Sequence, residues 1–203
     1  MTIISKEYEI SDKNYFKTKT KKNRIIIGGT QTVDMSFING WRHRWGGNYK
    51  KTQHFTITPT GKIYQHFPIE YFSKFTGIPE IDHETISIGL VNLTWLMKDH
   101  INNVWLDPLG FKVDINENSV VKRNWRDRTY WVKYNLRQIR KLSELINKLC
   151  IEGNIEKNII NHNTYIKDKK EFWTVSVRPN YLYYSTDIGA SFPFKELIDY
   201  GSL

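Results

Sequence analysis

The chain has 203 residues but only one cysteine, Cys150, so an intrachain disulfide is excluded. It has no hydrophobic run long enough to cross a bilayer, so we expect no membrane span. Residues 1–7 contain neither an apolar signal-peptide core nor a cleavage site. We therefore expect a protein made in a cytoplasm without a signal peptide. Lysis, a virion or an injection machine would have to carry it to any cell wall on which it acts.

Repeats, low-complexity segments and Pro/Gly/Ser-rich linkers are also absent, which predicts one domain over residues 1–203. The content of 39% hydrophobic and 14% aromatic residues is typical of a folded chain and excludes a disordered one. Acidic residues are outnumbered by basic ones, 21 against 30, and the formal net charge is +9. This excess favours contact with a polyanion or an acidic protein partner, although no nucleic-acid-binding module is recognisable.

Hydrophobic periodicity predicts a mixture of strands and helices. Residues 24–28, 52–58 and 86–93 are typical of core strands, and Pro59-Thr60-Gly61 is typical of a hairpin turn. The clearest helix begins near Leu136, because leucine and isoleucine then recur every three or four residues as far as Leu149. Further elements are predicted at 33–45 (helix), 62–67 (strand), 158–162 (strand) and 193–200 (helix).

Residues 95–131 are the least regular part, and we interpret them as an inserted hairpin or flap. Arg123, Arg126 and Arg128 lie among aromatic residues in this segment. Arginine beside aromatic rings suits the recognition of a nucleotide-like anion. A charged hairpin packed on its own aromatic residues explains the same pattern, and we prefer that interpretation.

Four segments together resemble a known family. Gly28-Gly29-Thr30 ends the first core strand, and Gln53 opens the next one. Ile160-Asn161-His162 follows the long helix, and Ser185 to Pro193 comes near the C-terminus. In order and spacing they resemble the zinc-dependent N-acetylmuramoyl-L-alanine amidases and the related peptidoglycan-recognition proteins. The resemblance covers roughly residues 24–93 and 132–198. It implies an α/β fold in which a central mixed sheet, flanked by helices, floors one shallow groove.

The resemblance also implies a zinc site, in which His162 and Asp187 match two metal ligands. The third ligand position, a histidine in the family, is Gly28, which has no side chain to bind a metal. Zinc sites use at least three protein ligands, so this pair alone should bind zinc weakly. We expect no cofactor, and zinc only if another residue supplies a third ligand. Gly28→His is the single change expected to raise zinc affinity most.

Other family positions are also altered. Gln53 stands where many members have a catalytic tyrosine, and Ser185 where a substrate-activating lysine is usual. Val91 replaces a glutamate, and Phe75 replaces a common histidine. Gln53 and Ser185 are therefore only weak candidates for catalytic residues. The resemblance implies a binding groove that includes Gly28, Thr30, Gln53, Val91 and Asn92.

Three hypotheses about function follow from these patterns. The one we prefer is an amidase-fold protein that binds a peptidoglycan fragment, a muropeptide or a partner without cleaving it. The second is an active zinc amidase, either a phage endolysin or an injected effector, whose metal site is rearranged so that His43 or His54 faces His162. The third is a structural protein of a phage virion or a binder of a host factor.

Overall fold

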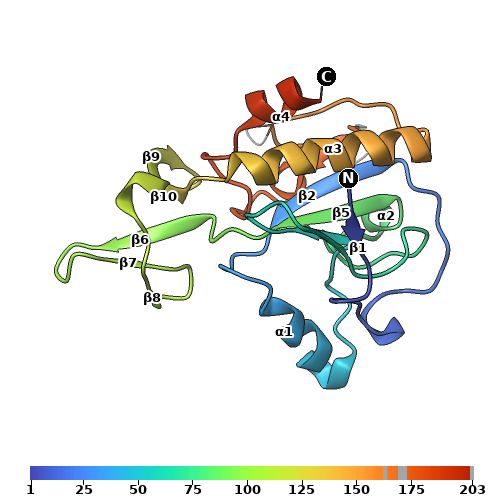
Figure 1. Cartoon of the computed structure of the whole chain (residues 1–203), viewed down its shortest axis with the longest axis horizontal. Helices are drawn as coiled ribbons and strands as arrows, with labels where there is room; N and C mark the ends of the chain where they lie inside the picture. Colours follow the sequence, from blue (N-terminus) through green and yellow to red (C-terminus); the bar gives the residue numbers. More distant parts are fainter. Residues whose placement is uncertain (162–163, 169–172, 202–203) are drawn as a thin grey trace.

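The computed structural model describes residues 1–161, 164–168 and 173–201. Its central sheet is formed by β1 (Ile3–Ile4), β2 (Arg24–Gly29), β3 (Phe55–Ile57), β4 (Ile63–Gln65), β5 (Thr85–Leu90) and β11 (Val175–Val177). The order is β1–β4–β3–β5–β2–β11, and only β3 and β4 pair antiparallel (Figure 1). This arrangement confirms the predicted α/β fold with a central mixed sheet.

Helices flank the sheet. Figure 1 shows α3 (Leu136–Gly153) lying along one face with α4 (Phe194–Tyr200) beside it, and α1 (Phe37–His43) on the other side. A short helix, α2 (Pro79–Asp82), precedes β5. The long helix begins where the Asn135 side chain accepts a hydrogen bond from the Arg137 N–H, and it ends at Asn154 in the left-handed conformation. Of the helices in the described ranges, none combines the length and apolarity needed to cross a membrane.

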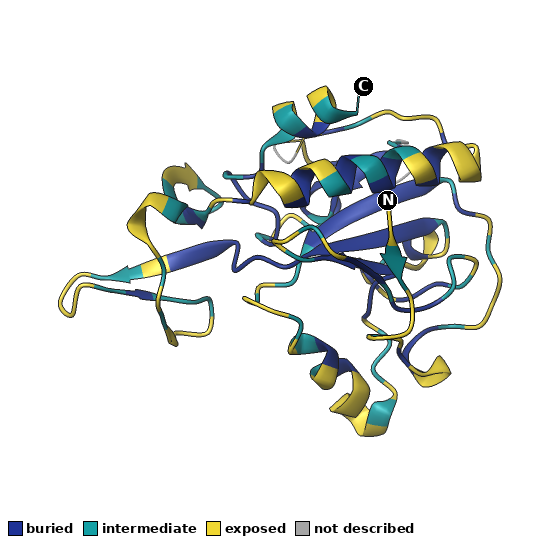
Figure 2. Ribbon diagram, viewed as in Figure 1, coloured by how far each residue is buried: buried dark blue, intermediate teal, exposed yellow. Residues whose placement is uncertain are grey.

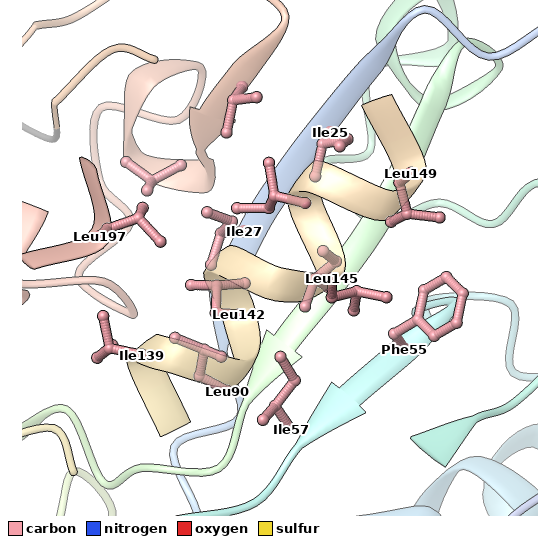
Figure 3. Close-up of a cluster of buried hydrophobic side chains, with 14 of the residues drawn as sticks. Ile25, Ile27, Phe55, Ile57, Leu90, Ile139, Leu142, Leu145, Leu149 and Leu197 are labelled. Carbon is pink, nitrogen blue, oxygen red and sulfur yellow. The ribbon is translucent and has the colours of Figure 1, made fainter. Parts of the chain in front are cut away.

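The isoleucines of β2 are buried on both faces of the sheet. Ile25 and Ile27 pack in one cluster with Leu142 and Leu145 of α3 (Figure 3), whereas Ile26 packs in a second cluster on the opposite face. The central strands and the inner side of α3 are correspondingly buried in Figure 2. Because side chains alternate along a strand, Gly28 lies on the same face as Ile26, away from α3.

Residues 95–132 form a second sheet that projects from one end of the molecule in Figure 1. Its strands are β6 (Trp95–Asp99), β7 (Val104–Leu106), β8 (Lys112–Val113), β9 (Val120–Trp125) and β10 (Arg128–Val132). They pair antiparallel in the order β8–β7–β6–β10–β9. Leu93, Leu96 and Trp105 form a small core of their own beneath it. The segment expected as a hairpin or flap is thus a five-stranded sheet.

Two predicted elements differ from the structure. The helix predicted over 33–45 is confined to α1, because Trp45, Gly46 and Gly47 adopt positive φ angles and turn the chain in a short 3-10 helix, η2 (Arg44–Gly47). Trp45 is exposed as a result. In place of the strand predicted over 158–162, the described part has a single bridge from Ile159 to Val175. The position beside β2 is taken by β11, which the sequence pattern did not reveal.

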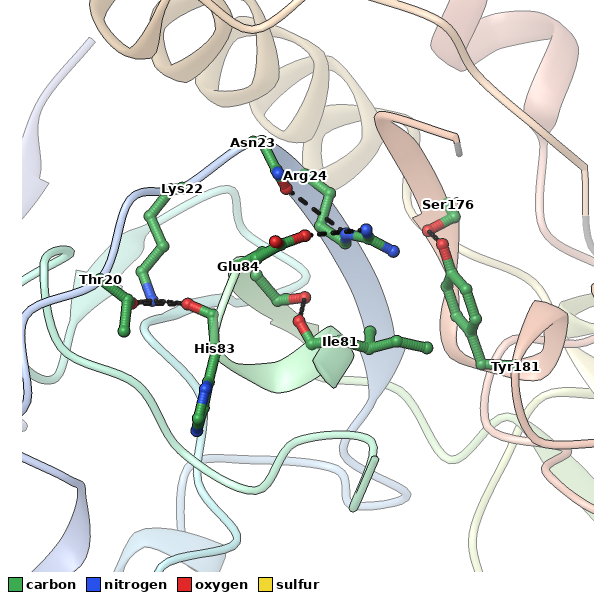
Figure 4. Close-up of polar contacts among 10 residues, drawn as sticks. Thr20, Lys22, Asn23, Arg24, Ile81, His83, Glu84, Ser176 and Tyr181 are labelled. Carbon is green, nitrogen blue, oxygen red and sulfur yellow. Dashed lines mark hydrogen bonds and ion pairs between the residues drawn. The ribbon is translucent and has the colours of Figure 1, made fainter. Parts of the chain in front are cut away.

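The basic segment over residues 20–24, which contains Lys21, Lys22 and Arg24, contacts the turn before β5 (Figure 4). The Lys22 Nζ donates to Thr20 Oγ1 at 2.7 Å and to the His83 carbonyl at 2.8 Å. Burial lowers the pKa of Lys22 to about 8. Arg24 forms an ion pair with Glu84 at 2.9 Å. These contacts join the start of β2 and the residues before it to the turn before β5.

We predict that Leu145→Ala lowers the free energy of unfolding by about 3 kcal/mol, because it removes buried methyl groups and leaves a cavity between α3 and β2. Leu136→Ala is the matched control, since Leu136 lies on the same helix and is 53% exposed. It should change the free energy by less than about 0.5 kcal/mol. Urea denaturation measures both, and equal effects would contradict this orientation of α3.

Candidate functional site

A groove lies on the sheet face that carries Gly28. It consists of two adjoining cavities of about 520 and 220 Å³. The larger is bounded by Thr30 after β2, by Trp41 of α1 and by Gln53 before β3. The smaller is bounded by the loop from Tyr184 to Asp187. Four residues line both cavities and form what we call the neck of the groove: Gln31, Lys51, Phe75 and Arg178.

Gly28 and Asp187 lie close together beside Phe75 of the neck, although Gly28 itself lines neither cavity. A Cβ atom placed on Gly28 would lie 2.9 Å from Asp187 Oδ2 and 2.7 Å from Phe75 Cζ. The structure thus brings together two of the positions that the sequence suggested for a metal site. The third, His162, lies outside the described residues. The Phe75 ring fills the space into which a side chain at position 28 would extend.

The carboxylate of Asp187 is buried and surrounded by donors. Its Oδ2 accepts a hydrogen bond from the Gly29 N–H at 3.0 Å and pairs with Arg178 Nη2 at 2.8 Å. Its Oδ1 accepts a hydrogen bond from the Ser185 hydroxyl. Only 1% of the side chain is exposed, so these groups replace the water that a carboxylate otherwise requires. Ser185, the candidate at the lysine position, thus binds Asp187.

Arg178 reaches this position because it directly follows β11. Val177 pairs with Ile27 in the parallel ladder, so the next residue, Arg178, is level with Gly28. Its guanidinium lies over the Phe75 ring, 5.2 Å from the centroid. A cation therefore already stands against Asp187. Arg178 was not predicted from the sequence because the strand β11 was not predicted, and the register of β11 is what places Arg178 in the site.

Among the described residues, the groove offers few free ligands for a zinc ion. Gly28 offers no ligand, and both oxygens of Asp187 already accept hydrogen bonds or pair with Arg178. Within the described ranges, no three His, Cys, Asp or Glu side chains form a group that could hold a metal. A catalytic zinc site requires three protein ligands and an open position for water.

His54 is buried with both ring nitrogens occupied. Its Nε2 donates to the Tyr71 carbonyl at 3.0 Å, and its Nδ1 accepts from the Ser87 N–H at 3.0 Å. Its ring packs against Phe67, with the centroids 4.2 Å apart. Burial lowers the pKa of His54 to about 3, so the ring is neutral near pH 7. The other candidate for a third ligand, His43, is exposed near the end of α1.

His66 anchors a chain of hydrogen bonds that runs to the groove. Its Nδ1 donates to the Tyr8 carbonyl at 2.8 Å, so its Nε2 accepts from the Thr56 hydroxyl at 2.7 Å. Thr56 Oγ1 in turn accepts from Gln53 Nε2 at 2.6 Å. The Gln53 amide lies over Gly89, where a Cβ atom would overlap it. Burial lowers the pKa of His66 to about 4, so this chain also holds a neutral ring.

No protein-family model and no curated protein sequence matches the chain. Solved structures do match it. The N-acetylmuramoyl-L-alanine amidase LysC from Clostridium intestinale URNW has 15% identity and a TM-score of 0.54, with 98% of this chain and 96% of that chain covered. A mutant endolysin from Bacillus subtilis has 17% identity and a TM-score of 0.51, with 100% and 96% covered.

A third match is the amidase AmiD from E. coli, in complex with the substrate anhydro-N-acetylmuramic acid-L-Ala-D-gamma-Glu-L-Lys. It has 14% identity and a TM-score of 0.57, with 92% of this chain and 60% of that chain covered. The chain has the N-acetylmuramoyl-L-alanine amidase fold. Identities at this level support the fold alone, so the site must be interpreted from its own residues.

Within this amidase fold, some of the residues predicted for the groove line it and others do not. Thr30 and Gln53 line the larger cavity. Val91 is buried, and its carbonyl accepts a hydrogen bond from Gln138 Nε2 at 3.1 Å. The side chain of Asn92 donates to the Lys133 carbonyl and accepts from the Thr94 N–H. Val91 and Asn92 therefore bind the chain around them and line neither cavity of the groove.

The second sheet supports the loop that carries Asp187. The Arg126 guanidinium donates to the carbonyls of Pro179, Leu182 and Ser185 at 2.6–2.9 Å. Trp131 covers Gly189, where a Cβ atom would overlap its ring. Arg126 also lies over the Trp125 ring and Arg128 over the Trp95 ring, 4.6 and 4.1 Å from the centroids, as expected for a charged hairpin packed on its own aromatic residues. The turn after β7 adds Pro108 and Leu109 to the wall of the larger cavity.

We predict that acid destabilises the protein through His54 and His66. Their folded-state pKa values, about 3 and about 4, lie below the ordinary 6.5, so the unfolded chain binds more protons between these limits. The stabilisation is present above pH 6.5 and is lost as the pH falls toward 4 and 3. From pH 7 to pH 5 the loss should be about 2 kcal/mol for each histidine.

Urea denaturation at the two pH values measures this loss, with His66→Gln as the comparison. The variant should lose about half of the pH dependence because one titrating ring has been removed. The same pH dependence in both proteins would show that His66 does not titrate as described.

Proposed function

We propose that this amidase-fold chain binds a peptidoglycan fragment in its groove and does not hydrolyse it. The AmiD complex with a muramic acid peptide supports this class of ligand for the fold. The larger cavity, about 520 Å³, is of the size that holds small organic ligands. Trp41 and Tyr49 line it and offer aromatic surface to a sugar ring, while Thr30 and Gln53 offer polar groups.

The proposal rests on the ion pair between Asp187 and Arg178. Its charge is compensated by Arg178 directly beside Gly28, where a zinc ligand would be needed. Hydrolysis by an amidase of this kind requires a metal that lowers the pKa of a bound water molecule. The histidines packed beneath the groove offer no substitute base, because His54 and His66 are neutral with both ring nitrogens engaged.

The proposal extends to where the chain acts. The structural likeness to an endolysin from Bacillus subtilis supports a role at a cell wall reached through lysis. A fragment-binding protein in that setting would meet both intact peptidoglycan strands and the pieces that lytic enzymes release from them.

We predict that the protein purified without chelator contains far less than one zinc per chain by elemental analysis, and that His162→Ala contains the same amount. Calorimetry should show binding of anhydro-N-acetylmuramic acid-L-Ala-D-gamma-Glu-L-Lys, and chromatography should recover this compound uncleaved. About one zinc per chain that is lost in His162→Ala, together with release of the peptide, would establish the active amidase instead.

We also predict that Gly28→His alone gains little zinc affinity, because its Cβ would meet Phe75 Cζ at 2.7 Å. The sequence alone led us to expect Gly28→His to raise zinc affinity most, but the structure indicates that Phe75 must also be made smaller. The triple variant Gly28→His, Phe75→Ala and Arg178→Ala should bind zinc at least about tenfold more tightly than the single variant, because it adds a ligand and frees Asp187.

Competition against a chromophoric chelator measures these affinities. The matched control is the double variant Phe75→Ala and Arg178→Ala, which keeps Gly28. If the double and triple variants bind zinc equally, position 28 does not face the metal, and the assignment of the site is wrong.

A further inference from the structure

We propose that the neck of the groove recognises a carboxylate, namely the free lactyl carboxylate of N-acetylmuramic acid. This inference rests on the proposed function and specifies which form of the fragment the groove prefers. The preferred form is the one left after the bond between the muramoyl group and L-alanine has been cleaved.

The charges at the neck support an anionic ligand. Lys51 and Arg178 line both cavities, and Arg44 lines the larger one. Of the described residues that line either cavity, Asp187 alone is acidic, and Arg178 already compensates it. Lys51 is exposed and has no acidic partner within the described ranges. One positive charge at the neck is therefore left without a counter-charge.

The geometry of Arg178 suits a planar anion. Its Nη2 holds Asp187, while its Nε is buried and has no hydrogen-bond partner among the described residues. The side chain is 24% exposed and lines both cavities of the groove. The Phe75 ring supports the guanidinium from one side. A guanidinium held in this way offers N–H groups in the plane that a carboxylate prefers.

The intact and the cleaved fragment differ in charge at the lactyl group. The muramoyl-alanine bond is a neutral amide, and hydrolysis converts it to a carboxylate on the sugar and an amine on alanine. A lactyl amide and a lactyl carboxylate have almost the same shape, so charge is what separates them. Hydrogen bonds to a charged group are stronger than neutral ones by an amount that corresponds to about tenfold in affinity.

The rest of the groove suits the neutral part of the sugar. Gln53 uses its Nε2 to bind Thr56, which leaves its Oε1 as a hydrogen-bond acceptor at the cavity wall. Trp41 and Tyr49 line the same cavity, and Arg44 lies over the Tyr49 ring, 5.5 Å from the centroid. The contacts of Gln53, Trp41 and Tyr49 would hold the acid and the amide equally, so the preference depends on the charged residues of the neck.

Calorimetry on the full chain tests the inference with N-acetylmuramic acid and its lactyl carboxamide, which has the same shape without the charge. The acid should bind at least about tenfold more tightly than the carboxamide. The preference should shrink as salt is raised, because the charges at the neck are partly open to solvent. A third ligand, anhydro-N-acetylmuramic acid-L-Ala-D-gamma-Glu-L-Lys, reports on fragment binding in general.

Lys51→Met is the decisive variant, because Lys51 has no acidic partner that its loss would leave unpaired. It should weaken binding of the acid about tenfold and change binding of the carboxamide by less than about twofold. Lys13→Met removes an exposed charge that lines neither cavity, and it should leave both affinities unchanged.

The outcomes separate the two proposals. If the tripeptide compound binds but the acid and the carboxamide bind equally, the inference is overturned and the proposed function stands. If none of the three compounds binds, the proposed function itself fails. An acid preference that persists unchanged in Lys51→Met would also overturn the role assigned to the neck.

Discussion

The carboxylate of Asp187 is buried away from water, and its position depends on hydrogen-bond and ion-pair partners from three parts of the chain. The Gly29 N–H comes from the end of β2, Arg178 from the end of β11, and Ser185 from the same loop as the carboxylate. A buried carboxylate without such partners would cost several kcal/mol. The ion pair and the hydrogen bond from Gly29 therefore join the ends of β11 and β2 to the C-terminal loop, and Arg178 gives the groove a fixed cation.

The support for this loop comes from a distant part of the chain. Arg126 in the second sheet satisfies three carbonyls between residues 179 and 185, and Trp131 packs onto Gly189. Loops that carry binding residues depend on a rigid scaffold to keep their shape. The second sheet is such a scaffold, and through Pro108 and Leu109 it also forms part of the wall. The shape of the groove thus depends on an element outside the central sheet.

Much of the fold could be predicted from the sequence. The isoleucines of β2 and the leucines of α3 follow clear periodicities, and the turn at Pro59 to Gly61 has its expected residues. The strand β11 has only three residues, too few for an alternating pattern to stand out. The ion pair between Arg178 and Asp187 depends on the register of that short strand. The neutral state of His66 depends on burial, which no local pattern reveals.

The same packing bears on how this groove could change in evolution. A histidine introduced at position 28 overlaps Phe75, and a smaller residue at position 75 leaves a cavity in the core. Loss of Arg178 leaves Asp187 with an uncompensated buried charge. Each of these three changes is therefore expected to lower the stability of the folded protein. Under the proposed function, substitutions accumulated one at a time toward a metal centre would pass through these less stable proteins, which favours keeping the groove as a binding surface.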